Sequence, residues 1–131
     1  MMPFISVVNL QKKYRIPSSR LNKAAACCAG SLELSLGEVT IVCVAPGRMR
    51  RMNKEFLGHD YVTDVITFDS GDIVICPETA SRFGRAHGQT TEEEMVLYVI
   101  HGMLHLAGYK DKKPNDIMIM RAMEKKMLAK L

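Results

Sequence analysis

The sequence lacks several features that would point to a secreted or membrane-spanning protein. It has no Cys-x-x-Cys motif, no low-complexity tract, no internal repeat, and no apolar run that would serve as a secretory signal or a membrane span. Its four cysteines stand at positions 27, 28, 43 and 76. We therefore expect free thiols in a reducing compartment, which indicates a cytoplasmic protein.

Length and composition set the next limits. With 131 residues, 47% of them hydrophobic and 24% charged, the chain can bury a core without disulfides. We expect one domain covering residues 1–131. Eighteen basic and fourteen acidic residues give a net charge of +4, which is compatible with an RNA partner but does not by itself indicate one.

Periodicity and turn residues predict short strands mixed with helices. The expected strands are Ile5 to Asn9, Glu38 to Ala45, Val62 to Phe68 and Ile73 to Cys76. A first helix is expected from Ser18 or Ser19, as N-cap, to about Ala29. After a break at Pro46-Gly47, a second helix is expected from Arg48 to Leu57. The others are expected from Pro77 to His87, from Thr91 to about Ala107, and from Pro114 onward. There is no regular βαβ alternation and there is one tight hairpin, so we expect an α+β fold with a small mixed sheet packed with helices.

The helix expected from Thr91 is the most informative one. Thr90-Thr-Glu-Glu93 is typical of a capping box, and the run from Met95 to Ala107 is almost entirely apolar, which predicts a buried central helix. Within this run, His101 and His105 are four residues apart and therefore share one face. A divalent metal would satisfy both buried imidazoles, because neutral imidazole is a common zinc ligand.

The residues after this helix offer a third ligand. Gly108 can take the left-handed turn that ends a helix, and the chain can then return Asp111 toward the histidines. Three protein ligands leave a fourth tetrahedral position for water, as in catalytic zinc sites. A histidine pair at helical spacing also arises by chance, and the glycine and carboxylate are what favour the metal interpretation.

Basic residues gather on the helix expected from Arg48, namely Arg48, Arg50, Arg51 and Lys54. They form either a solvated polar face or a patch that contacts phosphates.

The three predicted ligands His101, His105 and Asp111 are called the metal group below. Two hydrolytic chemistries suit a metal ion bound by them. Peptide hydrolysis is suggested by His-x3-His-x2-Gly, the metzincin spacing, but the glutamate that acts as general base in those proteases is Gly102 here. General-base help is worth about 10²–10⁴-fold, so this difference counts against a protease. Phosphodiester hydrolysis needs no such residue, since a metal can ionise its bound water and polarise a phosphoryl oxygen.

Several motifs occur together along the chain, namely Met52-Asn53, Asp60-Tyr61-Val62-Thr63-Asp64-Val65-Ile66-Thr67-Phe68, Gly71-Asp72-Ile73, His101-Gly-x-Leu-His105-Leu-x-Gly108-Tyr109, and Met120 with Glu124. In these motifs and their order the sequence resembles the YbeY family of bacterial ribosomal-RNA maturation endoribonucleases. The resemblance spans about Glu38 to the C-terminus.

The resemblance implies a zincin-like, zinc-dependent, single-strand endoribonuclease in the cytoplasm, with one zinc ion per chain and a metal-bound water as nucleophile. It implies a role in maturation of small-subunit (16S) ribosomal RNA and in ribosome quality control. Expected partners are ribosomal RNA, the small ribosomal subunit, ribosomal proteins and a ribosome-associated GTPase. We expect His101, His105 and Asp111 to bind the metal, with Thr63 and Asp64 in a supporting role or in a plain turn.

Two positions depart from the family pattern. Asp111 stands where the family has its third histidine, and carboxylate oxygen is an acceptable zinc ligand. Leu57 stands where the family usually has an arginine, so Arg48, Arg51 or His59 is expected to contact the substrate instead. A third class of function stays open, a ribosome-assembly factor whose metal only braces the fold, with His87, His59 or Cys76 as a fourth ligand.

Overall fold

The computed structural model describes residues 2–131 and has four strands and five helices in this part of the chain. The strands are β1 (Phe4–Asn9), β2 (Glu38–Cys43), β3 (Val65–Thr67) and β4 (Asp72–Ile75). The helices are α1 (Ser18–Ser31), α2 (Pro46–Leu57), α3 (Pro77–Ala86), α4 (Thr91–Leu106) and α5 (Pro114–Leu128). The α+β prediction is confirmed.

The strands form one mixed sheet in the order β1-β2-β4-β3. β1 pairs with β2 and β2 with β4 in parallel, whereas β3 and β4 form the antiparallel hairpin that the turn residues predicted. Gly71 closes this hairpin at φ 102°, and a Cβ there would lie 2.3 Å from the carbonyl oxygen of Glu38, so only glycine fits.

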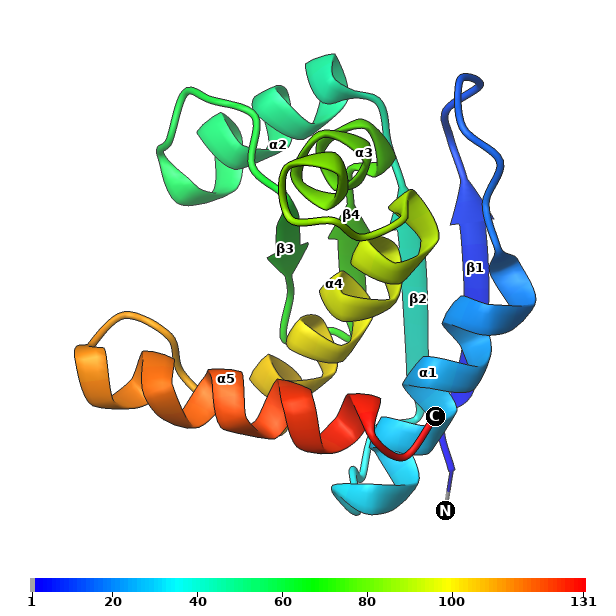
Figure 1. Ribbon diagram of the computed structural model, residues 1–131, viewed down its shortest axis with the longest axis vertical. Coiled ribbons are helices and arrows are strands. Elements are labelled where there is room, and N and C mark those ends of the chain that lie inside the picture. Colours follow the sequence, from blue (N-terminus) through cyan, green and yellow to red (C-terminus); the bar gives the residue numbers. More distant parts are fainter. Residues whose placement is uncertain (1) are drawn as a thin grey trace.

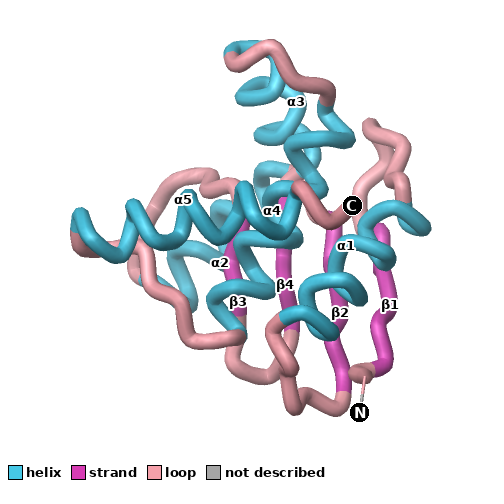
Figure 2. Tube along the Cα trace, turned by 60° about the horizontal axis from the view of Figure 1, so that its bottom comes forward, coloured by secondary structure: helices cyan, strands magenta, loops and turns pink. Residues whose placement is uncertain are grey.

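The two faces of the sheet are covered differently. Alternate residues such as Ile41, Ile73 and Ile75 are fully buried on the face that carries α1 and α4, and they belong to the larger hydrophobic core. Val74 and Ile66 point to the other face, where they pack with Met49 of α2 in a smaller cluster. Figures 1 and 2 show that α1 and α4 lie in front of the sheet and that α2 lies behind the sheet. Helix α5 lies across the C-terminal end of α4.

Several predicted boundaries were wrong. No serine caps α1: its N-cap is Pro17, without a side-chain hydrogen bond, and the helix continues through Gly30 to Ser31. Pro46 begins α2 instead of separating it from β2, because a proline at the first helical position needs no amide partner. The β-branched run from Val62 to Phe68 yields only the three-residue strand β3.

The cysteines are all free thiols in the described part of the chain. Burial raises the pKa of the Cys28 and Cys43 thiols to about 12, so both remain protonated at neutral pH. No helix among residues 2–131 is long and apolar enough to cross a membrane.

Candidate metal centre

Helix α4 positions the first two residues of the site. The capping box is present, with Thr90 Oγ1 accepting from the amide of Glu93 at 3.1 Å and Glu93 Oε1 accepting from the amide of Thr90 at 2.9 Å. The helix is buried along most of its length, including Met95, Val99 and Met103. Such packing fixes the direction in which His101 and His105 project.

The turn after α4 returns the third residue. Gly108 takes φ 100°, and the amide of Tyr109 donates to the carbonyl of Leu104 at 3.0 Å, which reverses the chain. Oδ2 of Asp111 then lies 3.2 Å from Nε2 of His101 and 3.2 Å from Nε2 of His105, and the two Nε2 atoms are 3.1 Å apart. The structure thus brings all three predicted ligands together, as a group suited to a metal ion.

A glutamate on α5 supports this group from behind. Nδ1 of His101 lies 2.6 Å from Oε2 of Glu124 and donates a hydrogen bond to it, which leaves a lone pair on Nε2 of the neutral ring. Metal-binding histidines usually have such a carboxylate partner, which fixes their orientation and raises their basicity. Three electron-pair donors that converge at 3.1–3.2 Å are stable together when a cation lies between them.

Arg121 in turn holds Glu124. Nη1 of Arg121 lies 2.5 and 2.7 Å from the two carboxylate oxygens. Burial alone would raise the pKa of the Glu124 carboxyl, but hydrogen bonds from His101 and Arg121 outweigh burial and lower its pKa. Glu124 therefore stays ionised at neutral pH, as the hydrogen bond to His101 requires.

The group fits a tetrahedral metal that is open to solvent. Ligand bonds of about 2.0–2.1 Å place the atoms of a tetrahedral site roughly 3.3–3.4 Å apart, close to the observed separations. The side chains of His105 and Asp111 are 28% and 35% exposed, whereas that of His101 is 13% exposed. In the part of the chain that the structure describes, none of the proposed fourth ligands His87, His59 and Cys76 belongs to the group.

Position 102 has no room for the general base of a protease. A Cβ on Gly102 would lie 2.7 Å from Cγ2 of Ile73, because α4 and β4 touch at this point. The Cβ of a glutamate at position 102 would therefore overlap with the side chain of Ile73. The structure therefore explains the glycine by packing and adds to the argument against a metzincin type of peptide hydrolysis.

The other predicted site residues lie in two different places. Asp64 lines a hollow beside His101, and its Oδ1 accepts from the amide of Val65 at 2.8 Å and from the hydroxyl of Thr63 at 3.3 Å. Arg48 lines a separate hollow on the α2 face of the sheet. Arg51 and His59 are exposed and do not line the hollow beside His101, so substrate contact by these three residues remains a prediction.

The sequence reasoning missed two supporting residues. The family motif marks Glu124 without giving it a role, because a partner 23 positions from His101 has no local signal. Arg121 was not singled out at all. Its only signal is the i,i+3 spacing to Glu124 on the expected last helix.

Comparison with known proteins agrees with this architecture. A family model described as Endoribonuclease YbeY matches residues 6–131. The chain is 35% identical over 127 residues to an Endoribonuclease YbeY of Elusimicrobium minutum, covering 84% of this chain and 89% of that protein. It is 38% identical over 108 residues to one of Bacteroides fragilis, covering 77% and 78%.

A solved structure is similar in fold. The solution structure of a protein from Thermotoga maritima superposes with a TM-score of 0.63 over 97% of this chain and 91% of that chain, at 24% sequence identity. The fold and the three clustered side chains together define a small α+β protein with a group suited to a metal ion. By its sequence the chain belongs to the Endoribonuclease YbeY family, and the predicted resemblance is confirmed.

Proposed function

We propose that this protein is a zinc-dependent endoribonuclease that cleaves single-stranded segments of ribosomal RNA during maturation and quality control of the small subunit. The observation that carries the proposal is the triangle of ligand atoms, 3.1–3.2 Å on each side, in a chain of the YbeY family. Relatives carry the name endoribonuclease, which supports RNA as the substrate. Ribosomal proteins and a ribosome-associated GTPase are the proposed partners, and the cytoplasm the proposed location.

His101, His105 and Asp111 would hold the zinc ion. When bound, zinc supplies Lewis acidity toward a phosphoryl oxygen and makes water a stronger acid. The chain's own contribution is orientation: Glu124 accepts the Nδ1 proton of His101 and keeps Nε2 directed at the site, and Arg121 keeps Glu124 ionised. Asp64, with Thr63 beside it, is a proposed supporting residue in the hollow beside His101.

Metal content and cleavage measured on the same samples test the proposal. The purified protein should hold about one zinc ion, His105→Ala should lose most of it together with RNA cleavage, and Asp111→His should retain it. His87→Ala is the matched control and should keep the metal, since His87 lies outside the group. Zinc retained in His105→Ala would refute the ligand assignment, and zinc-dependent cleavage of casein with intact ribosomal RNA would refute the nuclease.

A further inference from the structure

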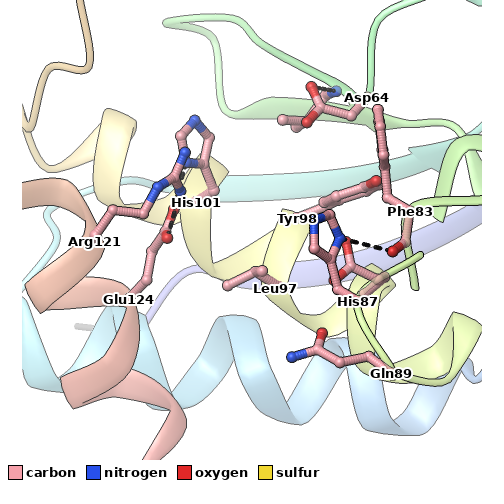
Figure 3. Close-up of a pocket in the computed structure, with 11 residues that line it drawn as sticks. Asp64, Phe83, His87, Gln89, Leu97, Tyr98, His101, Arg121 and Glu124 are labelled. Carbon is pink, nitrogen blue, oxygen red and sulfur yellow. Dashed lines mark hydrogen bonds and ion pairs between the residues drawn. The ribbon is translucent and has the colours of Figure 1, made fainter. Parts of the chain in front are cut away.

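A hollow of about 430 Å³ adjoins the metal group along α4. His101, Arg121 and Glu124 form one side, as Figure 3 shows. Residues of α3, the loop after it, α4, and the start of β3 with Asp64 before it form the rest. An RNA strand whose phosphate lies at the three ligands would therefore pass over or into this hollow. Its lining residues have contrasting chemistry at the two ends.

The end near α5 is cationic. Arg121 is the one lysine or arginine that lines the hollow among residues 2–131, and its side chain is 61% exposed. Its Nη1 is engaged with Glu124, while Nε and Nη2 make no hydrogen bond within the described chain. A guanidinium with free donors on an accessible edge is suited to a phosphate oxygen.

The opposite end is aromatic. Phe83 of α3 lines the hollow and is 47% exposed, and the ring of His87 lies 6.5 Å from its ring at 37°. Tyr98 also lines the hollow, with its buried hydroxyl close to the carboxyl group of Glu94.

Carboxyl groups decide which end can hold which part of a nucleotide. Asp64 and Glu94 lie toward the aromatic end with no lysine or arginine beside them in the described part of the lining, so they would repel a phosphate there, whereas Arg121 offsets the charge of Glu124 at the other end. The donors of a base edge can bond to carboxylate oxygens. Exposed aromatic side chains are common stacking surfaces for unpaired bases.

We propose that this hollow is a subsite for one nucleotide of the RNA strand, with the phosphate held by Arg121 and the base stacked on Phe83. The inference rests on the proposed function, because it assumes an RNA strand at the metal group. It assigns substrate contact to α3 and α5 instead of to the arginines of α2.

Binding of a 2′-O-methyl single-stranded RNA decamer to the zinc-loaded protein tests the subsite, because this probe is not cleaved. Fluorescence anisotropy across a salt series should show weaker binding by Arg121→Gln and a slope of log K against log salt that is smaller by about 0.7, one phosphate contact. Arg121→Lys should keep the slope. Arg82→Gln, which removes an exposed charge outside the hollow, is the matched control and should bind as the wild type does.

The base contact has its own test. Phe83→Ala should weaken binding about tenfold without changing the salt slope, while Phe56→Ala, an exposed aromatic outside this hollow, should not. Against decamers with one abasic nucleotide, moved along the strand, one position should abolish the effect of Phe83→Ala.

The outcomes separate the subsite from the proposed function. If Arg121→Gln loses zinc or kcat but keeps the affinity and the salt slope, Arg121 only positions Glu124 and the subsite is refuted. Cleavage of RNA with both contact variants binding normally also refutes it while the nuclease stands. Binding that depends on Arg121 and Phe83 in a protein that cleaves no RNA would refute the nuclease and keep the subsite.

Discussion

The two faces of the sheet are built from similar residues but differ in how completely they are covered. On the face of α1 and α4, isoleucines such as Ile41 and Ile73 are fully buried, and the candidate ligands His101 and His105 project from the helix packed against them. On the α2 face, Val42 is only partly buried, and Phe4 and Phe56 are 72% and 55% exposed. The candidate site thus lies on the more completely buried face, where packing can hold ligand positions within fractions of an ångström.

The largest expected effect compares alanine substitutions at neighbouring residues on the two faces. Ile41→Ala leaves a cavity in the larger core and should lower the free energy of unfolding by about 2–5 kcal/mol. Val42→Ala, the neighbouring residue on the α2 face, should cost only about 1 kcal/mol, because its side chain is already partly exposed. Urea unfolding of both variants measures the difference, and equal losses would show that the faces are equally packed.

The next effect concerns the support that α5 gives to the site. Glu124→Gln removes the charged acceptor of the His101 Nδ1 hydrogen bond, and zinc affinity should fall about 10–100-fold. Glu55→Gln, on the exposed surface of α2, should leave the affinity unchanged. Competition with a chromophoric chelator measures both. Unchanged affinity in Glu124→Gln would mean that packing alone orients His101.

A smaller effect is expected in the pH dependence of stability. Burial raises the pKa of Glu94, with Asp64 adding to the shift and His87 opposing it. The stabilising contribution of a group with a raised pKa is fully present below its unfolded value, near 4.5, and is lost as the pH rises through its folded value. Glu94→Gln, neutral throughout, should therefore gain stability over the wild type between pH 4 and pH 7.

Urea midpoints at several pH values test this prediction, with Glu55→Gln again as the exposed control. Glu124 has the opposite sign, because its lowered pKa gives stability above the unfolded value that is lost as the pH falls. A difference between Glu94→Gln and the wild type that does not change with pH would contradict the buried, shifted carboxyl.

The smallest effect is expected on the α2 face. Replacing Arg48 and Arg51 together by glutamine should weaken RNA binding less than Arg121→Gln does, because Arg48 lines a hollow across the sheet from the metal group. The decamer assay measures this. If the Arg48 and Arg51 double variant lost more RNA affinity than Arg121→Gln, the RNA would contact α2, as the sequence alone suggested. The substrate would then lie on the α2 face of the sheet.

Much of the site could be predicted because its signals are local. The capping box, the apolar run of α4, the four-residue spacing of His101 and His105, and the turn at Gly108 each depend on a few neighbouring residues. The start of α2 and the length of β3 were predicted less well. Proline is compatible with either a break or a helix start, and strand length depends on pairing with β4.

The sequence by itself therefore determined the family, the α+β class and three ligand candidates of the right chemistry. The tertiary structure decided that Glu124 meets His101, that Arg121 and Phe83 border one hollow, and that Arg48 lies on the other side of the sheet. The physical reason is separation along the chain. A helix turn is set by residues three or four positions apart, whereas the meeting of α3, α4 and α5 depends on how all the helices share the buried surface of one sheet.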